Sequence, residues 1–248
     1  MAVRIHLVNP NTTRSMTDKI AAAARAVAGP GTEIVAATSS MGPASIEGHY
    51  DDALALPGLL AAIAEAEAGG VDAHIIACFD DTGLDAARSL ARAPVVGIGE
   101  AGFHLASLIA HRFAVVTTLS RSVAVIEANL MRYGLDRRCA RVRASDVAVL
   151  ELEDPASNAR ARISQEIGRA IVQDHAEAVV LGCAGMADLA RDLAQEHGVP
   201  VIDGVASAVT LAEALVRTGL RTSKTGPYAA PRAKSYAGRL ADFAPRED

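Results

Sequence analysis

The chain has 248 residues, of which half are apolar, only 3% are aromatic and none is Trp, which favours a large core built from Ala, Val, Ile and Leu. A formal net charge of −5, with no run of Lys or Arg, argues against a nucleic-acid partner. No apolar stretch reaches the about 18 residues of a membrane span, and residues 1–7 do not resemble a signal peptide.

Strand and helix patterns alternate through the first half of the chain. We expect strands over 4–8, 33–37, 74–78 and 94–98, and helices over 14–27, 52–68, 84–91 and 101–110. The first strand runs into Asn9-Pro10-Asn11-Thr12-Thr13, where Pro ends strand pairing and Asn and Thr favour turns and helix caps. The long polar loop 38–50 is of a kind that is more often functional than idle, although a mobile surface loop would look the same.

The second half repeats this plan. We expect strands over 112–116, 141–148, 178–182 and 199–202, helices over 121–133, 158–174, 186–197 and 205–218, and an acidic loop that ends at Pro155. The polar segment 221–248 reads as a tail that packs on the surface or is partly loose. Strict alternation of strand and helix predicts an α/β protein with parallel sheets.

Three pairs of matching positions indicate an internal repeat. Arg14-Ser15 matches Arg121-Ser122 at an offset of 107, Cys78 matches Cys183 at 105, and the Pro-Val at 94 matches that at 200, an offset of 106. We therefore expect two pseudo-symmetric lobes, each a mostly four-stranded parallel sheet flanked by helices, with the active site in the cleft between them. Residues 1–98 and 206–248 are expected to form one lobe and residues 99–205 the other.

Cys78 and Cys183 each follow an apolar run of β character and precede a helical pattern. Parallel strands deliver such residues to the crevice at the carboxyl edge of the sheet, and a helix N-terminus lowers the pKa of a thiol. We expect one sulfur, as thiolate, to take a proton from a carbon acid while the other, as thiol, protonates the opposite face. Either cysteine alone would more often be a small core residue.

Other readings of the cysteines and histidines are weaker. A Cys78–Cys183 disulfide would block the pocket, and an odd number of cysteines does not suggest a disulfide scaffold, so we expect a reducing, cytoplasmic setting. Cys139 has no strand-end context and is taken as structural. No metal site is expected, because the chain has no Cys-x-x-Cys and no His pair with ligand spacing. His6 and His74 lie within predicted strands and are expected to be satisfied core residues.

The expected intermediate is an enolate-like anion, which needs hydrogen-bond donors. Asn9, Asn11, Thr117 and Thr118 end the equivalent first strands of the two lobes and are the candidates. Asp80, with its neighbour Asp81, is a candidate for binding the N–H groups of a substrate or a cation, or the two form a solvated pair.

Four stretches resemble the aspartate/glutamate/hydantoin racemase superfamily, and within it the hydantoin and allantoin racemases. They are residues 9–13 (NPNTT), 42–48 (GPASIEG), 77–84 (ACFDDTGL) and 181–186 (LGCAGM). The resemblance implies a cofactor-independent racemase that forms a homo-oligomer and uses Cys78 and Cys183 as its two acid/bases. The substrate pocket that it implies is lined by Asn11, Gly42, Pro43, Ala44, Ser45, Phe79, Thr117, Thr118, Ala184 and Gly185.

The residues after the cysteines narrow the expected substrate. Amino-acid racemases of the superfamily carry polar residues there, whereas this chain has Phe79 and Ala184. That difference favours a flat, neutral ring, so we expect a 5-substituted hydantoin, allantoin or an aryl or alkyl derivative, with inversion at C5. The alternatives are an Asp/Glu-type amino-acid racemase, an enzyme similar to arylmalonate decarboxylase or maleate isomerase, and a two-lobed small-molecule binding protein without catalysis. Decarboxylases of the superfamily typically need one cysteine, so the presence of two disfavours that reading.

Overall fold

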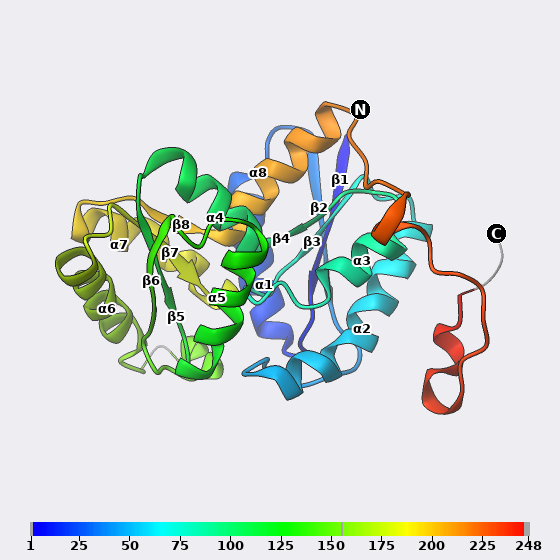
Figure 1. The fold of residues 1–248 in the computed structure, drawn as a ribbon, viewed down its shortest axis with the longest axis horizontal. Helices are drawn as coiled ribbons and strands as arrows, with labels where there is room; N and C mark the ends of the chain where they lie inside the picture. Colours follow the sequence, from blue (N-terminus) through cyan, green and yellow to red (C-terminus); the bar gives the residue numbers. More distant parts are fainter. Residues whose placement is uncertain (1, 155, 246–248) are drawn as a thin grey trace.

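The computed structural model describes residues 2–154 and 156–245, and it contains two four-stranded parallel sheets (Figure 1). The predicted acidic loop and the predicted lobe ranges also include residues 1, 155 and 246–248, which lie outside the described residues. The first sheet has the order β2-β1-β3-β4 and the second the order β6-β5-β7-β8. The strands are β1 (Val3–Asn9), β2 (Thr32–Thr38), β3 (Ala73–Ile76), β4 (Val95–Gly97), β5 (Phe113–Thr117), β6 (Cys139–Ala144), β7 (Ala178–Gly182) and β8 (Val201–Asp203). The predicted α/β fold with two parallel sheets is confirmed.

Helices connect the strands and cover both faces of each sheet. The α-helices are α1 (Arg14–Val27), α2 (His49–Ala68), α3 (Leu84–Leu90), α4 (Ile98–Ile109), α5 (Val123–Arg132), α6 (Ala159–Asp174), α7 (Ala190–His197) and α8 (Gly204–Arg217). Short 3-10 segments are η1 (Ser120–Ser122), η2 (Val149–Glu153), η3 (Ala184–Leu189), η4 (Gly226–Tyr228) and η5 (Gly238–Phe243). Within the described ranges no helix is long and apolar enough to cross a membrane.

Three predicted boundaries were wrong in ways that affect the site. The third strand stops at Ile76, because Ala77 makes the last ladder bond, to the Val8 carbonyl, and the chain then turns. The predicted helix 186–197 is a 3-10 segment from Ala184 followed by α7. The predicted strand 141–148 begins two residues earlier and ends at Ala144.

The strand order explains where the cysteines lie. In the first sheet β2 pairs with one edge of β1 and β3 pairs with the opposite edge, so the strand order reverses at β1. The carboxyl ends of β1 and β3 therefore flank a topological switch point, which is where open α/β sheets place ligands. β5 and β7 flank the equivalent point in the second sheet. Cys78 and Cys183 follow β3 and β7 at these two points.

Helices α4 and α8 join the two sheets. Each follows the last strand of one sheet and packs against the other, α4 on β7 and β8, and α8 on β3 and β4. They cross so closely that a Cβ on Gly204 would lie 2.6 Å from the Ile98 carbonyl oxygen. One buried cluster runs through both lobes, from Ile5 and Ile75 to Val115 and Val180. On these contacts we propose residues 1–98 with 206–248 as one lobe and 99–205 as the other.

Candidate active site

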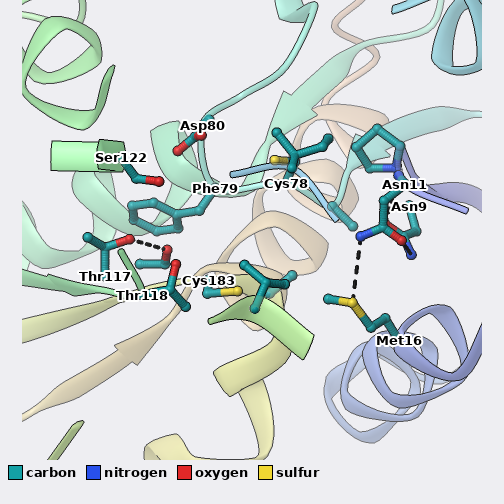
Figure 2. A pocket seen from close by; sticks show the side chains of 16 residues that line it. Asn9, Asn11, Met16, Cys78, Phe79, Asp80, Thr117, Thr118, Ser122 and Cys183 are labelled. Carbon is teal, nitrogen blue, oxygen red and sulfur yellow. Dashed lines mark hydrogen bonds between the residues drawn. The ribbon is translucent and has the colours of Figure 1, made fainter. Parts of the chain in front are cut away.

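A pocket at the carboxyl ends of the two sheets holds a cysteine from each lobe. Figure 2 shows Cys78 and Cys183 on opposite sides of it, with Phe79 and Thr118 toward one end and Asn11 toward the other. Both thiols are free. The residues that line this pocket are Asn9, Pro10, Asn11, Met16, Ile46, Ala77, Cys78, Phe79, Asp80, Thr117, Thr118, Ser122, Val149, Gly182, Cys183 and Ala184.

The loop that carries Cys78 is held by the buried carboxyl group of Asp81. Asp81 has a positive φ of 52°, and its own N–H donates to the Cys78 carbonyl at 3.0 Å. The two carboxyl oxygens accept the N–H groups of Gly99 at 3.0 Å and Glu100 at 2.8 Å, which belong to the first turn of α4. Gly97 leaves room for this arrangement, because a Cβ there would lie 2.1 Å from Asp81 Oδ1. The turn after Cys78 is therefore fixed to the start of α4.

The second lobe also holds this loop. Asn129, on α5, donates from Nδ2 to the Asp80 carbonyl at 2.9 Å. The hydroxyl of Tyr133, which follows α5, donates to Asp81 Oδ2 at 2.8 Å. Because these bonds cross from one lobe to the other, they set the position of Cys78 relative to the lobe that carries Cys183.

Cys183 lies between the end of β7 and the start of η3. Gly182 pairs with Thr117 across the sheet, and a Cβ on it would lie 2.8 Å from the Thr117 Cα, so only Gly fits there. Lys19, on α1 of the other lobe, reaches toward η3 and lies 3.2 Å from Asp188 Oδ1 and 3.3 Å from the Leu152 carbonyl. A cation from the first lobe thus lies near the cysteine of the second.

The net pKa shift of both thiols is upward, opposite to the expected effect of the helix N-termini, although the Gly185 N–H in the first turn of η3 does lower the pKa of Cys183. Burial, reinforced by the charge of Asp80, raises the pKa of Cys78 well above its ordinary value, although the Thr82 hydroxyl, 3.4 Å from the sulfur, opposes the rise. Burial also raises the pKa of Cys183 to about 11, opposed by the Gly185 N–H and the charge of Lys19. Desolvation of a thiolate outweighs these few donors, so both sulfurs are mainly thiols near neutral pH.

Asp80 contributes the one carboxyl group among the residues that line the pocket. Its side chain lines the pocket, and burial together with the charge of Asp52 on α2 raises its pKa to about 7. Its ionised form raises the pKa of both cysteines. The protonation state of Asp80 therefore bears on both sulfurs at once.

The four predicted donors differ in what remains available to a ligand. The side-chain amide of Asn9 donates within its own lobe, to Asn11 Oδ1 at 2.8 Å and to Thr17 Oγ1 at 3.1 Å. Thr117 donates its hydroxyl hydrogen to the Gly182 carbonyl at 3.0 Å. The Asn11 amide N–H has one long contact, 3.6 Å to the Met16 sulfur. Asn11 and Thr118 are thus the two of the four best placed to donate to a ligand.

The loop predicted to line the pocket lies one layer behind it. The Pro43 carbonyl accepts the Thr12 N–H at 2.9 Å, and the Ala44 carbonyl accepts the Thr13 hydroxyl at 2.7 Å. This loop, which includes Gly42 and Ser45, braces the turn that presents Asn11, and it brings Ile46 into the wall. Gly185 does not line the pocket either, but its N–H faces the Cys183 sulfur.

Other residues at the site were missed. Met16, Ile46, Ser122 and Val149 line the pocket. Ser122 belongs to the repeated Arg-Ser pair and Ile46 to the family-like stretch 42–48, whereas Met16 and Val149 carried no signal in the sequence. His6 and His74 are buried and hydrogen-bonded in the core, as expected, and their partner is each other, with the two Nδ1 atoms 3.0 Å apart.

The chain is similar to proteins whose activity is recorded in their names. A model of the family described as Asp/Glu/Hydantoin racemase matches residues 5–212. A hydantoin racemase of Rhizobium meliloti is 50% identical over 95% of this chain and 98% of its own length. Another, from Pseudomonas sp. (strain NS671), is 45% identical over 97% of each chain. The solved structure of allantoin racemase from Klebsiella pneumoniae has a TM-score of 0.95 and 48% identity, covering 98% of this chain and all of that one.

Proposed function

Because the chain belongs to the Asp/Glu/hydantoin racemase family and is a racemase, we propose that it interconverts the enantiomers of 5-substituted hydantoins, allantoin among them, with Cys78 and Cys183 as its two bases. The observation that carries this proposal is the pair of free thiols, one from each lobe, on opposite sides of one pocket. Inversion of a stereocentre by proton transfer needs one group on each face of the carbon.

One sulfur, as thiolate, removes the proton from C5 and becomes a thiol, and the electron pair of the C–H bond passes into the ring as an enolate. The other sulfur, as thiol, gives its proton to the opposite face of C5 and becomes the thiolate. The reverse reaction exchanges the two roles. A hydantoin C5–H lies between a ring nitrogen and a carbonyl group, so it is more acidic than an amino-acid Cα–H, and no cofactor is invoked.

The pocket suits the ring and its enolate. Phe79 is buried and packs edge-on against Phe103, with ring centroids 5.3 Å apart, so it offers a fixed apolar wall to a flat ring. The Asn11 amide and the Thr118 hydroxyl lie at opposite ends of the pocket, so one of them supplies a donor to the enolate oxygen and the other to the second ring oxygen. Asp80, with a pKa near 7, binds ring N–H groups as a carboxylate or donates to a ring oxygen when protonated.

We also propose that the protein acts as a homo-oligomer in the cytoplasm. Both thiols must be reduced for this mechanism, and a reducing compartment keeps them so.

Racemisation is tested by following the optical rotation of single enantiomers of aryl, alkyl and ureido hydantoins. We expect the wild-type protein to abolish rotation for at least one of them, and Cys78→Ser and Cys183→Ser each to slow this by about 10²–10⁴-fold, the usual contribution of a general acid or base. Cys139→Ser is the matched control and should retain activity. Unchanged rotation across the whole panel would refute the proposal.

A second measurement tests the division of labour between the cysteines. In deuterated water each single Ser variant should still exchange the C5 proton of one enantiomer while failing to racemise it, and the two variants should prefer opposite enantiomers. Exchange of both enantiomers by either variant would show that one sulfur serves both faces. A protein that only binds hydantoins would exchange neither.

A further inference from the structure

The outer face of α2 is apolar and has no partner within the chain. The helix buries Ala55, Leu59 and Ile63 against the sheet, yet its opposite side is also apolar. Tyr50 is 77% exposed and Leu54 51% exposed. The outer positions 50, 54, 57, 61, 64 and 68 are Tyr, Leu, Pro and three Ala, with the alternating spacing of four and three residues that pairs helices. Most of the polar residues of α2 lie at its sides, so two opposite faces are largely apolar, and an apolar helix face is normally covered.

The C-terminal segment leaves the body on the same side of the molecule. It is first anchored to α3, where Lys224 Nζ donates to the Arg88 carbonyl at 2.7 Å and the Tyr228 hydroxyl donates to Asp85 Oδ1 at 2.9 Å. Beyond that point it runs out past α2 and α3 (Figure 1). Every residue from 229 to 242 is exposed, and among the described residues no hydrogen bond or ion pair joins 230–245 to the rest of the chain. We call residues 229–245 the arm.

The arm carries exposed apolar and basic side chains. Leu240 is 49% exposed, and Tyr236 is also exposed. Residues 221–248 contain six Lys or Arg and three Asp or Glu, whereas the preceding 220 residues contain 18 and 26. The segment is therefore positively charged and the body negatively charged, so a second copy offers the arm both apolar and electrostatic complementarity.

We propose that a second copy of this chain packs on the outer face of α2, and that the arm of each copy lies across the other. A 20-residue helix is about 30 Å long and 10 Å wide, so one face of α2 offers about 300 Å², well below the about 800 Å² per partner of a stable interface. The arm has 17 residues, six of which form η5, and it reaches up to about 48 Å if the other eleven are extended. The arm supplies the area that the helix face lacks.

This interface would lie next to the active site. α2 begins directly after the loop that carries Ile46 into the pocket wall, and it holds Asp52, whose charge acts on Asp80. The inference deepens the proposed homo-oligomer, and it does not depend on the cysteine chemistry.

The first experiment measures mass in solution by light scattering after size-exclusion chromatography. We expect the full chain to have at least twice its monomer mass of 25.6 kDa. Leu54→Arg should reduce this to the monomer mass, because it places a positive charge on the apolar outer face of α2, against the basic arm of the other copy. Leu108→Arg, at a 78% exposed position at the end of α4, is the matched control and should keep the wild-type mass. A monomeric wild-type protein, or a Leu54→Arg variant of unchanged mass, would overturn the proposal.

The second experiment reports on the arm. The chain has no Trp, so Leu240→Trp introduces a single fluorophore. We expect blue-shifted emission that moves to the red on dilution and in the Leu54→Arg background. Solvent-exposed emission from an assembled protein would show that the arm is not in the interface. Blue-shifted emission from a monomer would show that the arm folds on its own body.

The same samples separate this inference from the proposed function. If the protein assembles as expected but racemises no hydantoin, the proposed function fails and the interface stands. If it racemises as a monomer, the interface fails and the proposed function stands. Far-UV circular dichroism of Leu54→Arg and Leu240→Trp confirms that neither substitution unfolds the chain.

Discussion

We expect Tyr133→Phe to destabilise the protein more at alkaline than at acidic pH. The Tyr133 hydroxyl donates across the lobes to Asp81 Oδ2 at 2.8 Å, beside the N–H of Glu100. Burial raises the pKa of Asp81 to about 7, and the hydroxyl of Tyr133 opposes that rise. A carboxyl group whose pKa is raised by folding stabilises the fold below its unfolded pKa, and this contribution is lost as the pH rises through the folded pKa.

The size of the effect follows from the state of the acceptor. At about pH 5 the bond is made to a neutral carboxyl and contributes about 1 kcal/mol, whereas at about pH 9 it is made to a buried carboxylate and contributes about 2 kcal/mol. The difference of about 1 kcal/mol corresponds to a further rise of about 0.7 in the pKa of Asp81 when the hydroxyl is removed. In a chain of this length the melting temperature should fall by about 3 °C at the acidic pH and about 6 °C at the alkaline pH.

Thermal unfolding followed by circular dichroism at the two pH values measures both losses. Asp81→Asn is the control background, because an amide does not titrate there, and in it Tyr133→Phe should cost the same at both pH values. An equal loss at the two pH values in the wild-type background would refute the assignment of Asp81 as the titrating acceptor.

Three further expectations concern the same site. Gly97→Ala places a Cβ 2.1 Å from Asp81 Oδ1 and should cost about 2 kcal/mol of stability, which lowers the melting temperature by about 4–8 °C. Gly168→Ala is the control and should not lower it, because the nearest atom to its Cβ, His197 Cε1, is 3.8 Å away. Thr82→Val removes the hydroxyl 3.4 Å from the Cys78 sulfur and should reduce kcat/KM about fivefold, for a loss of about 1 kcal/mol; an unchanged value would contradict that contact's role. In the wild type, kcat/KM should rise with pH by up to about tenfold per unit below pH 8, because both thiols have a raised pKa and one must ionise; a flat profile would contradict this.

The sheets and the positions of the cysteines were accessible from the sequence. Runs of β-branched residues mark strands, and the near-constant offset between matching positions revealed that Cys78 and Cys183 occupy equivalent places. Parallel strands end at one edge, so that equivalence was enough to predict a shared pocket. The comparison of Phe79 and Ala184 with related racemases then narrowed the expected substrate.

What the sequence did not reveal depends on contacts between distant segments. Asn129 and Tyr133 hold Asp80 and Asp81 from about 50 residues away, and no local pattern records such a bond. The direction of the thiol pKa shifts was wrong for a related reason. A helix N-terminus is visible in a sequence, but the desolvation of Cys78 and Cys183 arises only when both lobes close around them.

The two cysteines share the charge of Asp80 but otherwise have unlike surroundings: the Thr82 hydroxyl acts on Cys78, and the Gly185 N–H and the charge of Lys19 act on Cys183. Enantiomers have equal free energies in an achiral solvent, so the equilibrium constant of racemisation is one and kcat/KM must be identical in the two directions. No asymmetry between the lobes, natural or introduced, can alter that equality. The asymmetry can appear as differences in kcat between the two enantiomers that are matched by equal differences in KM. It can also appear as unequal solvent isotope effects, because the two directions start from different distributions of one proton between the two sulfurs.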